Sequence, residues 1–159
     1  MLSDSFQVNY VLVKPHDTEF TLRREKSEER AYYLGTIYGY HETKEGCLAG
    51  ASGMGYLGAV KYLISRGANV HAEDDYALRW ASKYGHLEVT QYLVGVGANI
   101  HAWNDCALRW ASEGGHLEVV KYLIRVGADV HAEDDEALML ASENGHLKVA
   151  KFLISQGAE

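Results

Sequence analysis

Residues 67–96 read GANVHAEDDYALRWASKYGHLEVTQYLVGV, and residues 97–126 read GANIHAWNDCALRWASEGGHLEVVKYLIRV. The two stretches align without a gap, and twenty of the thirty positions are identical. Residues 127–156 keep the same skeleton, and residues 46–67, GCLAGASGMGYLGAVKYLISRG, match the second half of the unit. Self-similarity at a fixed period of about 20–50 residues indicates a stacked repeat array.

Each unit predicts two short helices. Asp75 precedes the first helical segment and suits an N-cap, as do Asp105 and Asp135 at the equivalent positions. The first helix, with the core ALRWAS, is expected to end at Gly85, and the second helix, HLEVVKYLIRV, at Gly127, because glycine readily takes the left-handed conformation of a C-cap. Helices this short are marginal alone. They are therefore expected to be stabilised by packing against neighbouring units.

The segments GHLEVVKYLI and GADVHAEDD resemble the second helix and the following loop of ankyrin repeats, and ALRWAS stands where that family has a first helix led by Thr-Pro-Leu-His. The resemblance covers residues 46–159 and implies an all-α helix-turn-helix solenoid. Ankyrin units have about 33 residues, and the three missing here fall in the loop, which implies shortened or absent β-hairpin fingers. The short unit is also similar to ankyrin arrays of large amoeba-infecting viruses. Tetratricopeptide and leucine-rich repeats fit less well, because their characteristic patterns are absent.

The repeat register divides the chain into an N-terminal capping segment, 1–36, and an ankyrin-type array, 37–159. The four units of the array are 37–66, 67–96, 97–126 and 127–156. Residues 5–14 partly alternate and predict a strand or an extended arm, whereas residues 28–41 keep traces of the unit and predict a degenerate capping helix. The last unit keeps apolar side chains where a polar cap is expected: Leu138, Leu140, Val149 and Leu153. Either the array is truncated at Glu159, or a partner chain pairs with this end; the oligomeric state is left open.

The 159 residues carry a formal net charge of −7, all of it in residues 67–159. An acidic balance disfavours binding to phosphate backbones, so no nucleic-acid partner is expected. No apolar run reaches the roughly 18 residues of a membrane span, and the first residues lack the pattern of a secretory signal. We therefore expect no membrane partner and a cytoplasmic, intracellular location, which the viral resemblance would make the host cell cytoplasm.

The histidines and cysteines predict structural roles. Six of the eight histidines recur once per unit: His71, His101 and His131 in the loop, and His86, His116 and His146 before the second helix. Stacked units lie about 8–10 Å apart, whereas zinc needs ligands about 2 Å away, so these side chains are expected to bond loop backbone and tie unit to unit. Cys47 and Cys106 lie almost two units apart, too far for a disulfide. Both are expected to be reduced, with Cys106 partly exposed.

Two other patterns also lack the features of a chemical site. Residues 46–55, GCLAGASGMG, have neither the Lys-Ser/Thr ending nor the preceding strand of a phosphate-binding loop. The acidic runs at 73–75, 104–105 and 133–136 offer fewer than the six to eight oxygens that calcium needs. They favour a solvated acidic ridge that steers a basic partner. No catalytic residue, no metal and no cofactor are expected.

Positions that differ between units are free to recognise a partner. In ankyrin proteins the loop tips and the end of the first helix line the concave binding face, and the resemblance places twelve variable residues there: Met54, Glu73, Tyr76, Lys83, Tyr84, Trp103, Cys106, Glu113, Glu133, Glu136, Glu143 and Asn144. Trp103 is the main expected anchor, because glutamates occupy its position in the neighbouring units, and Tyr84 is the second. Trp80 and Trp110 exchange with Leu140 and are expected in the core.

The predicted function is a non-catalytic protein–protein interaction scaffold that binds a partner with basic and apolar groups on the concave face. One alternative is an adaptor that presents substrates to a ubiquitin ligase, as some viral ankyrin proteins do, although residues 1–36 show no second motif for that role. The other is an enzyme that uses N-terminal polar residues: His16, Asp17, Glu19, Arg23, Arg24 and Lys26. About 36 residues are too few to enclose a pocket, so this alternative ranks last.

Overall fold

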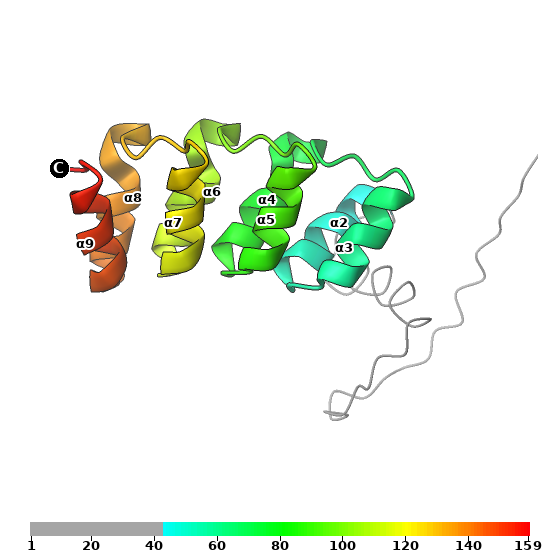
Figure 1. Ribbon diagram of the computed structural model, residues 1–159, viewed down its shortest axis with the longest axis horizontal. Helices are drawn as coiled ribbons and strands as arrows, with labels where there is room; N and C mark the ends of the chain where they lie inside the picture. Colours follow the sequence, from blue (N-terminus) through cyan, green and yellow to red (C-terminus); the bar gives the residue numbers. More distant parts are fainter. Residues whose placement is uncertain (1–42) are drawn as a thin grey trace, which may run out of the picture.

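The computed structural model describes residues 43–159, which form eight helices in four successive pairs and no strand (Figure 1). The first helices of the pairs are α2 (Lys44–Gly53), α4 (Ala72–Lys83), α6 (Ala102–Glu113) and α8 (Ala132–Glu143). The second helices are α3 (Leu57–Ser65), α5 (Leu87–Gly95), α7 (Leu117–Arg125) and α9 (Leu147–Ser155). The predicted capping segment 1–36, the strand at 5–14 and the capping helix at 28–41 lie outside the described residues.

The pairs stack side by side, and each contacts only the pairs next to it (Figure 1). The four first helices form one row and the four second helices another, with much closer contact between neighbouring first helices. The array therefore bends toward the first-helix row, which is its concave side. This arrangement confirms the predicted helix-turn-helix solenoid, in which stability comes from contacts between nearest neighbours.

Small residues explain why the first helices approach so closely. Ala51, Ala81, Ala111 and Ala141 recur once per unit on these helices, and each is 0% exposed. Leucines fill the space between the two rows: Leu48, Leu78 and Leu108 on the first helices, and Leu63, Leu93, Leu123 and Leu153 on the second. Each fully buried leucine contributes about 1.5–3 kcal/mol. Helices of nine to twelve residues therefore persist through this shared core.

Both kinds of helix end where the sequence predicts. Gly85 follows α4 with φ 77°, and Gly127 follows α7 with φ 109°. These are left-handed conformations that glycine adopts without the steric cost of a Cβ atom. The chain can thus reverse at the end of each helix and return along its partner.

The aspartates that were predicted as N-caps have another role. Asp75 itself has a left-handed φ of 56°. Its Oδ1 accepts a 2.9 Å hydrogen bond from the backbone N–H of Asn99 in the next unit and lies 3.0 Å from Nδ1 of His71. The bond to the next unit recurs twice, from the Asp129 N–H to Asp105 and from the Glu159 N–H to Asp135. The N-cap prediction was wrong, because these carboxylates join consecutive units instead of binding free amides of their own helix.

The histidines before the second helices also join consecutive units, as predicted. Nε2 of His116 donates a 2.9 Å hydrogen bond to the carbonyl oxygen of Lys83, one unit earlier. The same bond links His86 to Gly53 and His146 to Glu113. Burial lowers the pKa of His116, which keeps its ring neutral at pH 7. Within the described residues, no group of three or more potential ligands is placed to hold a metal ion.

Candidate partner-binding face

Aromatic side chains gather on the exposed side of α4. Tyr76, Trp80 and Tyr84 recur every four residues and therefore share one face of this helix. The ring centroids of Tyr76 and Trp80 lie 5.2 Å apart, and those of Trp80 and Tyr84 lie 5.6 Å apart at 71°. Trp80 also lies against Gly53 of α2, where a Cβ atom would come within 2.6 Å of the indole ring. Trp80 is thus half-buried on this face and not in the core, contrary to expectation.

Two tryptophans from the next unit extend this group across to α6. Arg79 is 4% exposed as a residue, and its guanidinium lies 4.6 Å from the ring centroid of Trp103 and 5.6 Å from that of Trp110. Nζ of Lys83 lies 4.8 Å from the Trp110 ring. Trp110 is therefore half-buried over the cations of α4 and is not a core residue either. Tyr76, Trp80, Tyr84, Trp103 and Trp110 are called the aromatic cluster below.

Trp103 lies in a left-handed turn at the start of α6. Trp103, Asn104 and Asp105 have φ values of 53°, 53° and 55°, and the same turn occurs at 73–75 and 133–135. A left-handed conformation costs about 1–2 kcal/mol for each residue that has a Cβ atom. This turn stands where the resemblance implied a shortened finger. Its first two side chains are exposed, whereas the aspartate at its third position is buried at 75 and 105 and half-buried at 135.

An arginine in the following helical turn binds the carbonyl groups of the left-handed turn. Arg109 donates from Nε to the carbonyl oxygen of Asn104 at 3.1 Å and from a terminal nitrogen to that of Trp103 at 2.7 Å. Arg79 makes the equivalent bonds to Asp74 and Glu73, at 3.0 and 2.6 Å. Met139, 50% exposed, occupies the equivalent position in the last unit. The turn at 133–135 therefore lacks this support.

Internal contacts fix the orientation of Trp103, although its side chain is 60% exposed. Its indole Nε1 donates a 3.0 Å hydrogen bond to Oδ2 of Asp74, and Arg79 lies against one face of the ring. The predicted exposure of Trp103 is thus confirmed. Little conformational entropy remains to be lost when a ring held in this way binds another group.

The other predicted contact residues divide by exposure. Exposed residues are Met54, Glu73, Tyr84, Glu133, Glu143 and Asn144, and half-buried residues are Tyr76, Lys83, Glu113 and Glu136. Cys106 is only 2% exposed, which corrects the expectation that it faces a partner. Its short side chain is buried, whereas the longer side chain of Tyr76 at the equivalent position of the preceding unit is half-buried. Burial raises the pKa of the Cys106 thiol, and Cys47 is buried as well.

Charge is unequally divided between the two rows of helices. In units 67–156, the loops and first helices carry eleven acidic and three basic residues, whereas the second-helix segments carry two acidic and four basic residues. The exposed carboxylates of the left-handed turns, here called the acidic ridge, are Glu73, Asp74, Glu133 and Asp134. Asp75 and Asp105 are buried and do not belong to it. The ridge residues belong to the first turns of α4 and α8, and these helices begin at the edge where the loops join successive pairs (Figure 1).

A family model for ankyrin repeats, in three copies, matches residues 47–134 and 78–159. The chain belongs to the ankyrin-repeat family. Ankyrin repeats generally mediate protein–protein interaction and are typically non-catalytic. A comparison with curated proteins finds no match.

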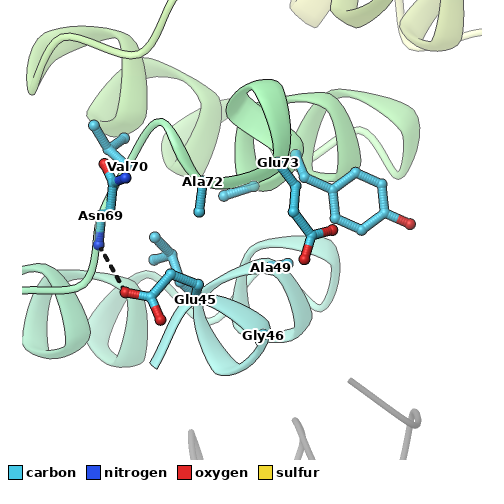
Figure 2. A pocket seen from close by; sticks show the side chains of 10 residues that line it. Glu45, Gly46, Ala49, Asn69, Val70, Ala72 and Glu73 are labelled. Carbon is cyan, nitrogen blue, oxygen red and sulfur yellow. Dashed lines mark hydrogen bonds between the residues drawn. The ribbon is translucent and has the colours of Figure 1, made fainter. Parts of the chain in front are cut away.

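One hollow lies between α2 and α4 of this ankyrin array (Figure 2). The Glu45 carboxylate at its edge accepts a 3.3 Å hydrogen bond from the Asn69 N–H, in the same register as the link made by Asp75. The hollow measures about 10 Å³, which is at most room for one water molecule. Among residues 43–159, no helix is long and apolar enough to cross a membrane.

Two features that shape this ankyrin face were not predicted from the sequence: a repeated arginine and a glycine. Arginine occupies the equivalent positions 79 and 109 within ALRWAS. The repetition of a charged residue inside a helical segment could have indicated a structural role for it. The glycine is Gly53, and its signal was that the later units have Lys83, Glu113 and Glu143 at the equivalent position. Its missing side chain makes room for Trp80.

Proposed function

We propose that this ankyrin array is a non-catalytic scaffold that binds a protein partner on its first-helix face, at the aromatic cluster. The observation that carries the proposal is Trp103, an exposed indole whose orientation is fixed by Asp74 and Arg79. Tyr84, 49% exposed, is the second anchor on the same face. Large, preorganised aromatic side chains are the residues that most often dominate the energy of an interface.

The partner presents apolar groups to the aromatic cluster and basic groups to the acidic ridge. Complementary charge speeds the encounter and excludes partners that carry acidic surfaces. In the described part of the chain, the hollow between α2 and α4 measures about 10 Å³ and is not lined by Trp103 or Tyr84, so these exposed anchors suit the surface of another protein better than a small substrate. The ubiquitin-ligase adaptor stays an untested alternative, because the second motif it requires would lie outside the described residues.

A cytoplasmic location is part of the same proposal. The Cys106 thiol is buried and forms no disulfide, which fits a reducing compartment. The similarity of the 30-residue unit to arrays of amoeba-infecting viruses would place the partner in a host cell.

Affinity capture from cells of the source tests the proposal, with three forms of the immobilised full chain. The wild type is compared with a Tyr84→Ala/Trp103→Ala variant and with a Gln91→Ala/Lys121→Ala control on exposed positions of the second helices. The anchor variant is expected to retain less than about one tenth of a partner that the control retains fully. A partner retained equally by both variants would contradict the proposed face.

A further inference from the structure

The Trp103 ring has one face in use and one face open. Arg79 lies against the inner side at 4.6 Å, and Asp74 binds the edge of the ring through Nε1. An exposed fraction of 60% leaves the outer face to solvent. The inner contact shows that the indole ring of Trp103 already binds one guanidinium group, that of Arg79. Such contacts contribute about 0.5–2 kcal/mol, depending on desolvation.

The surroundings of this open face favour a cation from outside. Within the described residues, no cationic side chain is paired with the carboxylates of the acidic ridge. The four cations of the described first helices are already engaged: Lys44 donates to the Arg66 carbonyl oxygen, Arg79 is buried against turn carbonyls, Arg109 pairs with Glu136, and Lys83 lies over Trp110. Arg79 beneath the ring would by itself weaken the attraction of a second cation, but the four ridge carboxylates outnumber it.

The spacing of these features defines the shape of the partner. Glu73 and Asp74, Trp103, and then Glu133 and Asp134 stand on three successive units at the same place in the repeat. Neighbouring units are separated by about 8–10 Å, the usual distance between packed helices. A polyproline II segment rises about 3.1 Å per residue and has three residues per turn. Every third side chain therefore points the same way and is displaced by about 9 Å.

We infer that the first-helix face binds an extended polyproline II segment with a cationic residue at every third position. The central arginine or lysine stacks on the outer face of Trp103, and the cations on either side pair with the two ends of the acidic ridge. This inference rests on the proposed function and specifies the class of partner for the same face. Arginine is favoured at the centre because its planar group stacks on indole and pairs with carboxylates.

Two synthetic peptides of identical composition test the spacing. One repeats Arg-Pro-Ala three times, and the other carries its three arginines consecutively, followed by the prolines and alanines. Binding to the full chain is measured by titration calorimetry at about 50 mM salt, where ridge charges are weakly screened. The spaced peptide is expected to bind at least about five times more tightly than the clustered one. Equal affinities, or no binding by the spaced peptide up to millimolar concentration, would overturn the inference.

Matched variants then locate the contact. Glu73→Gln/Glu133→Gln and Glu88→Gln/Glu118→Gln change the net charge equally, but the first pair lies on the ridge and the second on the second helices. The ridge pair and a separate Trp103→Leu variant are each expected to weaken the spaced peptide about tenfold, and the control pair less than twofold. Equal losses in both glutamine pairs would mean attraction by net charge alone and would refute the site.

The same variants separate this inference from the proposed function. A natural partner that requires Tyr84 and Trp103 but binds the Glu73→Gln/Glu133→Gln variant normally would overturn the cationic segment and leave the scaffold proposal standing. Circular dichroism of each variant, with an unchanged helical spectrum and melting temperature, shows that a lost contact is not lost folding.

Discussion

Thr90 is a polar residue in a buried column that is otherwise apolar. The equivalent positions on the other second helices are Val60, Val120 and Ala150, and Thr90 is itself 0% exposed. Its hydroxyl oxygen has no hydrogen-bond partner among the described residues. An unsatisfied buried hydroxyl costs about 1–3 kcal/mol, whereas a methyl group of similar shape has no such cost.

The Thr90→Val variant is therefore expected to be more stable than the wild type by about 1–2 kcal/mol. Val60 and Val120 show that the array accepts valine at this position without a change in backbone. Urea denaturation followed by circular dichroism should show a higher midpoint with an unchanged slope. The melting temperature should rise by about 3–8 °C.

The reverse exchange, Val120→Thr, is the matched control and should destabilise the array by a similar amount. If Thr90→Val leaves the midpoint unchanged or lowers it, the hydroxyl has a partner that satisfies it, and the reasoning from burial is refuted. A change in the urea slope would mean instead that the cooperativity of the array had changed.

Three further perturbations test the contacts that shape the array. Replacing Arg109 by methionine, as at Met139, should destabilise by about 1–3 kcal/mol in urea denaturation, because two carbonyls of the strained turn lose their donor. Lowering the pH below about 6.5 should reduce the midpoint, and less so in a His116→Gln variant. The folded-state pKa of His116 is lowered, so its contribution is complete above the unfolded value and is lost as pH falls toward the folded value. Gly53→Ala should displace the Trp80 ring, change the near-ultraviolet circular dichroism and lower stability by about 1–3 kcal/mol.

Each of these three predictions would be contradicted by a specific result. An Arg109→Met variant as stable as the wild type would mean that water satisfies the turn carbonyls equally well. A midpoint that rises on acidification would contradict the neutral His116 ring. An unchanged near-ultraviolet spectrum in Gly53→Ala would show that the Trp80 ring has free space over α2.

The fold was predictable because four similar units carry the same sequence pattern and therefore indicate the same local structure. Glycines spaced 30 residues apart, such as Gly85 and Gly115 after the first helices, mark helix ends in every unit, and apolar positions repeat in phase with them. Twenty identical positions between two units exclude an accidental pattern. The left-handed turn was not predictable, because residues such as Asp75 rarely adopt positive φ and instead suggest a conventional N-cap.

The candidate site was predictable only in part, because variation between units does not measure exposure. Trp103 and Cys106 both vary, yet one is 60% and the other 2% exposed. Position 103 lies on a projecting turn, where any side chain reaches solvent. Position 106 holds a buried cysteine, whereas the longer tyrosine at the equivalent position 76 is half-buried. Side-chain length and the path of the turn decide exposure here, and neither follows from the repeat pattern.

Arg79 links the stability of this array to the proposed binding face. The same guanidinium binds the carbonyls of its own turn and supports the Trp103 ring of the next unit. Changing Arg79 would therefore disturb both stability and the binding face, whereas Trp103→Leu leaves the turn contacts of Arg79 and Arg109 in place. Arg109 has no aromatic ring to support, since Glu133 stands at the next equivalent position. Within the described residues, the contact between Arg79 and Trp103 therefore occurs at one unit boundary. On the proposed binding mode, a partner must place its central cation there to reach both ends of the acidic ridge.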